Sequence, residues 1–141
     1  MTYSLAFSQS LYIVLLIAAK VQQGQFDFVP TQRISEILDI PPSTVGVILR
    51  RLHHARLIET REGANGGVRL ALPPGQISVL DVFMAVEQGR PLFHTNSLSR
   101  VTGEKITKVQ DAIVNLLGSA EESMQKRLRE VTIEKLLDAT N

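Results

Sequence analysis

Three glycines within five residues, set between two short segments of β-forming residues, constrain this chain more than any other feature. Glycine accepts positive φ and lets the backbone approach a partner closely. Gly63, Gly66 and Gly67 therefore predict a tight, exposed β-hairpin. Its two strands are expected at 57–61 and 68–72. A hairpin of this kind, directly after a helix, indicates the wing of a winged-helix protein.

Two short helices are predicted directly before the hairpin. They cover 31–38 and 42–57, and the residues 39–41 between them give the spacing of a helix-turn-helix. In the second helix, apolar residues at i, i+3, i+4 and i+7 form a stripe that faces the core. They are Val45, Ile48, Leu49 and Leu52. The opposite face is free to enter the DNA major groove, so the pattern indicates a DNA-binding regulator.

The predicted DNA contacts lie at the start of the two helices, on the exposed face of the second helix, and in the hairpin. They are Thr31, Ser43, Thr44, Val47, Arg50, Arg51, His54, Arg61, Asn65, Gly66 and Gly67. We expect Arg50 and Arg51 to contact bases or phosphates, and His54 and Arg61 to anchor the DNA backbone. Three plainer readings stay open. The hydroxyls can be helix caps, the arginines solvated surface, and the hairpin tip without function.

The composition is compatible with a DNA-binding protein. With 141 residues, 44% of them hydrophobic, the chain can bury one core. The formal net charge is only +1, but between residues 31 and 70 six arginines stand against four acidic residues. Because phosphate contacts require clustered basic residues, this half of the chain fits double-stranded DNA as a partner.

The N-terminal segment predicts a buried helix. Residues 4–21 have a helical pattern and are nearly apolar in their middle. The longest strongly apolar run, 11–19, is too short to span a bilayer, and the first residues lack the basic region of a signal peptide. We therefore expect a cytoplasmic protein with no membrane partner.

Several blocks of the sequence resemble the bacterial Rrf2 transcription regulators. They are the segment 42–52, which ends in Ile-Leu-Arg-Arg-Leu, the spacing Gly63-x-x-Gly66-Gly67, and the segments 77–82 and 85–87. This family includes an iron-sulfur cluster regulator, a nitric-oxide-sensing repressor and a cysteine-metabolism repressor. The resemblance implies a dimeric winged helix-turn-helix repressor, with the second helix in the major groove and the wing near the minor groove.

The chain departs from the family pattern in ways that bear on its signal. Family members that sense iron or nitric oxide hold a cluster through three cysteines, and this chain has none. Only His94 in the segment 92–105 is a good soft-metal ligand, so we expect no metal and no cofactor. Arg56, Glu62 and Val68 stand where the family commonly has Gly, Arg and Tyr, so the resemblance does not carry over the operator sequence.

After the hairpin, residues 78–88 predict another helix. Ser78 and Asp81 have the spacing of a capping box, and the segment 89–91 ends the helix. The polar segment 92–103 is expected to connect it to the C-terminal part. Four apolar residues in this region can either line a pocket for an unidentified small-molecule effector or serve as packing; they are Phe83, Leu92, Phe93 and Leu98.

A long apolar stripe in the C-terminal part predicts a dimerisation helix. Its members recur at spacings of three and four, typical of a helix that packs along its length against another helix. They are Ile106, Val109, Ile113, Leu116, Ala120, Met124, Leu128 and Val131. Gly118, followed by Ser-Ala-Glu-Glu, can break or kink this helix. A last short helix is expected at 132–137.

The predicted fold class is therefore mainly α with a small β-wing. We expect a winged helix-turn-helix domain at 1–90, a connecting segment at 91–105 and dimerisation helices at 106–141. As a homodimer, the protein would present two recognition helices about one DNA turn (roughly 34 Å) apart and bind a near-palindromic operator.

Other functions find less support in the sequence. The glycine run is not followed by Lys-Ser, Lys-Thr or a helix, as a nucleotide-binding loop requires. His53 and His54 are adjacent, so they do not share one helix face, and Asp81 and Glu87 do not converge as an acid-base pair. We therefore expect no enzyme activity. The remaining alternative is a dimeric scaffold that uses the wing to contact a protein.

Overall fold

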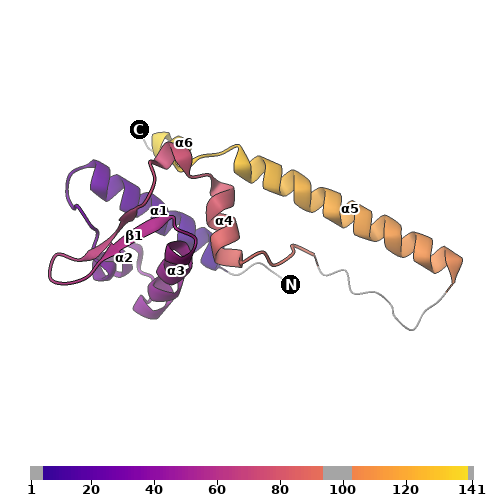
Figure 1. The fold of residues 1–141 in the computed structure, drawn as a ribbon, viewed down its shortest axis with the longest axis horizontal. Helices are drawn as coiled ribbons and strands as arrows, with labels where there is room; N and C mark the ends of the chain where they lie inside the picture. Colours follow the sequence, from indigo (N-terminus) through magenta and orange to yellow (C-terminus); the bar gives the residue numbers. More distant parts are fainter. Residues whose placement is uncertain (1–4, 94–102, 140–141) are drawn as a thin grey trace.

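The fold is mostly helical, with one two-stranded antiparallel sheet and a long helix near the C-terminus, as the sequence predicts (Figure 1). A computed structural model describes residues 5–93 and 103–139. Its elements are α1 (Ala6–Gln22), α2 (Thr31–Leu38), α3 (Pro42–His54), β1 (Ile58–Arg61), β2 (Gly67–Leu70), the 3-10 helix η1 (Pro74–Gln76), α4 (Val79–Glu87), α5 (Glu104–Arg129) and α6 (Ile133–Asp138).

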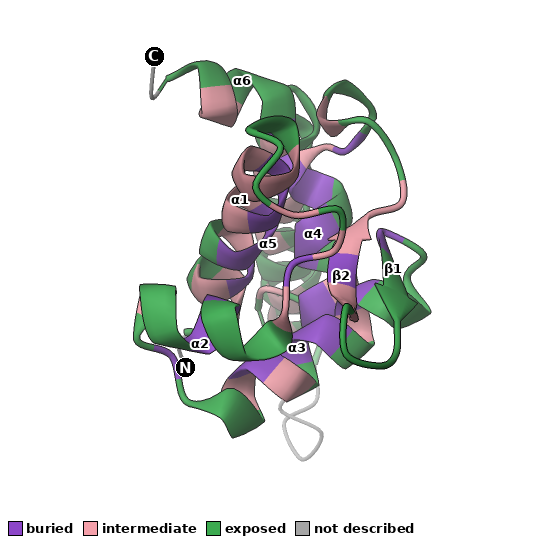
Figure 2. Cartoon of the chain, turned by 90° about the vertical axis from the view of Figure 1, so that its left-hand side faces the viewer, coloured by how far each residue is buried: buried purple, intermediate pink, exposed green. Residues whose placement is uncertain are grey.

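One hydrophobic core joins α1, α3 and α4 with the base of the wing. The predicted stripe of α3 is buried, and Ile13 and Ile17 of α1 lie in the same cluster. Phe7 of α1 and Phe83 of α4 pack edge to face, with ring centroids 5.1 Å apart. Figure 2 shows buried residues on α1, α3 and α4, while the loop joining β1 to β2 is exposed. Burial of α1 follows from its apolar middle.

The wing is pinned to the body by a third extended segment. β1 and β2 pair with Thr60 opposite Val68, and Val68 also exchanges two backbone hydrogen bonds with Val29. This bridge joins the segment before Pro30 to the wing. The strands are shorter than predicted, because Leu57 and the residues after Leu70 lie outside the sheet.

Gly67 lies in β2 and not at the tip of the wing, which corrects the sequence-based prediction. Its φ is +152°, and a Cβ at this position would collide with the carbonyl oxygen of Val29. Glycine is therefore required here because the backbone of the preceding segment passes directly over it. The tip consists of 62–66, where the amide of Gly66 donates to the carbonyl of Gly63.

Helix α4 begins with the predicted capping box. The Ser78 hydroxyl accepts from the amide of Asp81, and the Asp81 carboxylate accepts from the amide of Ser78. The helix ends at Glu87, before the predicted Gly-Arg-Pro stop. Phe83 is buried against Phe7, so packing accounts for this predicted pocket residue. Leu98 and His94 lie outside the described residues.

The sequence left open whether Gly118 breaks the long helix, and α5 runs through this residue without a break. The helix ends at Arg129, and Val131 therefore does not continue the apolar stripe. Instead, the Val131 carbonyl accepts a hydrogen bond from the amide of Val79 at the start of α4. Figure 1 shows α5 extending away from the body, with its C-terminal end attached beside α4.

Helix α6 belongs to the body and not to the long helix. Thr132 caps it by accepting from the amide of Lys135, and Ile133 is fully buried in the core cluster. Leu136 and Leu137 pack against the same cluster. The three-part division at residues 90 and 105 stays a prediction.

Two glycine substitutions should shift stability in opposite directions. Gly67→Ala should lower the free energy of unfolding by about 2–4 kcal/mol, because it forces a strained φ and a clash with backbone. Gly118→Ala should raise it by about 0.5–1 kcal/mol, because a Cβ there meets nothing within 4 Å and α5 gains a better helix former. Urea denaturation measures both. A Gly67→Ala protein as stable as the wild type would contradict the close approach of Val29.

Candidate DNA-binding surface

The turn between α2 and α3 is held by Ser35. Its hydroxyl donates to the carbonyl of Ile40 at 2.6 Å, and the Ile40 amide donates to the carbonyl of Ser35. Asp39 ends α2 in the left-handed region, with φ at +52°, which reverses the chain within three residues. Ile40 is buried, so the turn is fixed to the core. These contacts set the angle at which α3 leaves the body.

Helix α3 begins at Pro42 and has no side-chain cap. Ser43 and Thr44 therefore do not cap the helix, although capping was one alternative for their hydroxyls. The first amide of α3 with a backbone partner in the turn is Val45, which donates to the carbonyl of Pro41. The two preceding amides, of Ser43 and Thr44, lie at the positive end of the helix, where an anion is stabilised.

The predicted contact residues on α3 do not all have the same surroundings. Arg50, His54 and Ser43 are exposed, and Val47 keeps 38% of its surface exposed. Arg51 is half-buried, and its Nη1 donates to the carbonyl of Val86 at 2.9 Å, near the end of α4. The structure thus gives Arg51 an internal partner that ties α3 to α4.

A groove of about 540 Å³ separates α3 from the wing. It brings together five predicted contact residues from three parts of the chain, namely Thr31, Arg50, His54, Arg61 and Gly67. The other lining residues are Gly46, Leu49, His53, Thr60 and Val68. Among these described lining residues there is no carboxylate, and the charged ones, Arg50 and Arg61, are both cationic.

Sequence reasoning missed three polar or small residues of this groove: Gly46, His53 and Thr60. The sequence pattern that could have identified the two residues of α3 is their spacing from Arg50. Positions 46, 50 and 53 are four and three residues apart, so they share one face of the helix. That face turns toward the wing and not directly away from the core. Thr60 directly precedes Arg61 in β1, and both residues line the groove.

Arg61 is held in place by the segment that precedes α2. Its guanidinium carbon lies 4.2 Å from the centre of the Phe28 ring, and Nη1 lies 3.4 Å from Asp27. Nη2 donates to the carbonyl of Asn65 in the wing tip at 2.9 Å. The arginine that was predicted to anchor the DNA backbone therefore also orders the tip.

Arg69 of β2 shares these neighbours. Its guanidinium carbon lies 4.5 Å from the Phe28 ring centre, and Nε donates to Glu59 at 2.9 Å. The hydrogen bond to Glu59 raises the pKa of Arg69 above its ordinary value, so the side chain keeps its charge. The Phe28 ring thus contacts one arginine from each strand of the wing.

Position 56 shows why one departure from the family pattern matters. Arg56 follows α3 with φ at +62°, and its amide donates to the carbonyl of His53. A left-handed residue directly after a helix is the position that glycine fills at least cost. The resemblance places Gly at this position in other family members. The backbone of this chain has the conformation that favours Gly, although the residue is Arg56.

The predicted dimerisation stripe has no buried residue within α5. Val109 is 55% exposed, Ile113 49% and Leu116 67%. Ile106, Met124 and Leu128 are half-buried and Ala120 is exposed. The body attaches to α5 through the Leu92 amide, which donates to Glu121 at 2.7 Å.

The described residues include no group of three histidine, aspartate or glutamate side chains that could hold a metal ion. Glu87 pairs with Arg90 at 2.6 Å, and Asp81 serves as a helix cap. No described helix is long and apolar enough to cross a membrane.

A helix-turn-helix followed by a wing, with a positively charged groove between them, defines a winged helix-turn-helix DNA-binding protein. The chain belongs to the Rrf2 family: the family model, described as an iron-dependent transcriptional regulator, matches residues 3–139. Proteins of this family are transcriptional regulators and not enzymes.

Individual relatives agree in fold and class. YffB of Lactococcus lactis subsp. lactis, named as an HTH-type transcriptional regulator, is 27% identical over 99% of this chain and 89% of its own length. The structure of IscR from T. potens is similar with a TM-score of 0.72 at 19% identity, covering 100% of this chain and 89% of that one. CymR, named as the global cysteine regulator of B. subtilis, gives a TM-score of 0.64 at 20% identity, covering 100% and 99%.

The iron named in the family description does not fit the donor set of this chain. The sequence contains no cysteine, so a cysteine-ligated cluster cannot form. His94, the soft-metal ligand noted in the sequence, lies outside the described residues.

Neighbouring arginines on α3 should differ in their effect on stability. Arg51→Ala should lower the free energy of unfolding by about 1–2 kcal/mol, because it removes a half-buried charged donor from the Val86 carbonyl. Arg50→Ala should change it by no more than about 0.5 kcal/mol, since Arg50 is exposed. Thermal and urea unfolding of the two variants measure this. If Arg51→Ala is as stable as the wild type but loses DNA binding, Arg51 acts as a DNA contact.

Proposed function

We propose that this protein is a sequence-specific repressor that binds a near-palindromic operator as a homodimer. The observation that carries the proposal is the groove between α3 and the wing, which is lined by arginine and histidine without a carboxylate among its described residues. Membership of a transcriptional regulator family supports DNA as the partner. Its place of action would be the bacterial cytoplasm.

The groove has the position that a DNA backbone needs. When a helix lies in the major groove and a wing reaches the adjacent minor groove, the sugar-phosphate strand that separates them passes between helix and wing. Arg50, His54 and Arg61 line that passage, so the two guanidinium groups can neutralise phosphates and His54 can hydrogen-bond to one. Ser43, Thr44 and Val47 on the free face of α3 would then meet base edges.

The wing tip supplies the second contact. Asn65 is exposed, and its carbonyl is already used by Arg61, so its side-chain amide is the group that remains for DNA. Gly66 adds little bulk beside it, which suits a narrow minor groove. Arg51 is assigned a positioning role, because its bond to Val86 fixes α3 relative to α4.

The exposed stripe of α5 supports the homodimer. A helix of 26 residues is about 39 Å long at 1.5 Å per residue, and most of it extends beyond the body. Apolar residues on one face of such a helix are stabilised when a second helix covers them. A second copy offers the same stripe, and twofold symmetry then doubles the base contacts.

Repression follows from occupancy of a promoter. A dimer bound to a near-palindrome covers DNA that RNA polymerase would otherwise use. Each bidentate contact contributes about 1–3 kcal/mol of discrimination between bases, so two recognition helices select a site far better than one.

Arg50→Ala should weaken binding to the specific operator by about tenfold or more, and should weaken binding to unrelated DNA less. The operator is found first by footprinting DNA upstream of the protein's own gene, and affinities are then measured by gel shift at several salt concentrations. Arg129→Ala, which removes an exposed arginine from α5, is the matched control and should bind like the wild type. Equal losses on both DNAs would reassign Arg50 to phosphate positioning. Binding without steep salt dependence would favour a protein partner instead.

Leu116→Glu should convert the dimer into monomers, because it places a charge in the centre of the proposed interface. The folded monomer should persist, since Leu116 is 67% exposed in the isolated chain. Asn115→Glu is the control: it is also exposed, but lies about 150° around the helix from the middle of the stripe. Analytical ultracentrifugation measures both. A wild-type protein that is monomeric at micromolar concentration would overturn the homodimer.

A further inference from the structure

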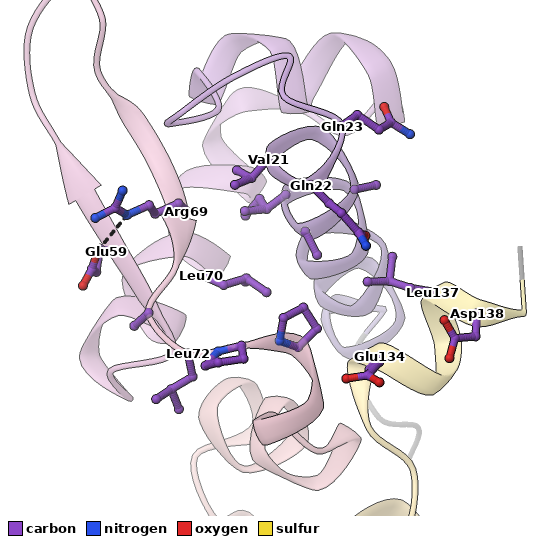
Figure 3. Close-up of a pocket in the computed structure, with 16 residues that line it drawn as sticks. Val21, Gln22, Gln23, Glu59, Arg69, Leu70, Leu72, Glu134, Leu137 and Asp138 are labelled. Carbon is purple, nitrogen blue, oxygen red and sulfur yellow. Dashed lines mark hydrogen bonds and ion pairs between the residues drawn. The ribbon is translucent and has the colours of Figure 1, made fainter. Parts of the chain in front are cut away.

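A second cavity lies away from the groove, between α1, the base of the wing and α6 (Figure 3). Its volume is about 690 Å³, within the range of small-molecule sites. The end of α1 forms one wall, β2 and the following prolines form the second, and α6 forms the third. Nothing in the sequence pointed to this place, because its walls come from three distant segments.

The cavity joins apolar walls to a surplus of negative charge. Leu70, Leu72, Leu137 and two prolines supply apolar surface. The charged lining residues are Glu59, Arg69, Glu134 and Asp138. Glu59 and Arg69 are paired with each other at 2.9 Å, so the net charge of the lining comes from the two carboxylates of α6.

Glu134 and Asp138 are spaced i and i+4, so both carboxylates project from the same face of α6. No other described residue forms a hydrogen bond or an ion pair with either carboxylate. The absence of a side chain at Gly75 lets the Glu134 carboxylate lie against the backbone of η1, where a Cβ would collide with Oε2. Two neighbouring carboxylates beside apolar walls are stabilised by a cation.

We propose that this cavity binds a small organic cation that carries an apolar body, such as an alkyl or aryl amine. The ammonium group would lie between Glu134 and Asp138, and the apolar body would contact Leu70, Leu137 and the prolines. An anionic ligand would meet two charges of its own sign, and a neutral one would bring no opposite charge to either carboxylate.

The proposed ligand would contact the wing as well as α6. Leu70 and the Glu59–Arg69 pair belong to the wing, while α6 follows the residue that anchors the end of α5. A bound ligand would therefore affect the position of the wing. Only this effect depends on the function proposed above.

The test compares three probes of the same length: 4-phenylbutylamine, which is a cation at neutral pH, 4-phenylbutanol and 4-phenylbutyrate. Titration of the full-length protein is followed by ¹H–¹⁵N correlation spectra, without DNA. The amine should bind at least fivefold more tightly than the alcohol, and the acid should bind weakest. Shifts should concentrate at 17–23, 69–74 and 134–138. Equal affinities, or shifts centred on α5 or α3, would overturn the proposal.

The variant Glu134→Gln/Asp138→Asn should lose the preference for the amine while keeping its spectrum otherwise unchanged, since both side chains are exposed. The matched control is Asp111→Asn/Glu122→Gln, which removes two exposed carboxylates from the side of α5 opposite the apolar stripe and should bind the amine like the wild type. An unchanged preference in the first variant would overturn the proposal. A protein that binds the amine here but no operator would overturn the proposed function and leave this site standing.

Discussion

The approach of the Gly67 backbone to Val29 is the contact on which the proposed DNA-binding surface depends. Val29 pairs with Val68 through two backbone hydrogen bonds, and Pro30 then begins α2. The segment that pins the wing is thus continuous with the helix-turn-helix. Because the link is made by backbone, with a glycine where a side chain would collide, the distance between wing and α3 is nearly independent of the surface residues on either. The groove between them is consequently a fixed feature of the fold, and its side chains can vary with the operator.

Helix α5 differs from the wing, because it is a long element with no buried residue. Helices in water gain most of their stability from packing an amphipathic face, and the stripe that includes Ile113 and Leu116 has no such packing in one chain. Its end is fixed, because the Val131 carbonyl bonds to Val79 and Glu121 receives the Leu92 amide. A helix anchored at one end, with an apolar face extending from the body, supports the proposed homodimer. In the proposed dimer, the position of α5 would therefore set the spacing of the two recognition helices.

Local patterns in the sequence predicted local structure well. The capping box of Ser78 and Asp81, the buried stripe of α3 and the hairpin around Gly63 depend on residues close in sequence. What could not be predicted depends on distant partners. Arg51 looks like any exposed arginine until α4 places a carbonyl beside it, 35 residues along the chain. Gly67 looks like a tip residue until Val29 is known to cross it. Gly118 suggested a break, yet the residues around it continue α5 because a single exposed glycine costs a helix only about 1 kcal/mol.

The two strands of the wing connect the groove with the cavity on the other side. Arg61 lines the groove and Arg69 lines the cavity, and both stack on the single ring of Phe28 while sharing Asp27. Any movement of Arg69 would change the surroundings of Phe28 and Asp27. Arg61 depends on the same two residues and in turn holds the carbonyl of Asn65 in the wing tip. A ligand that moved Arg69 would therefore alter the surroundings of Arg61 through one aromatic ring and one carboxylate.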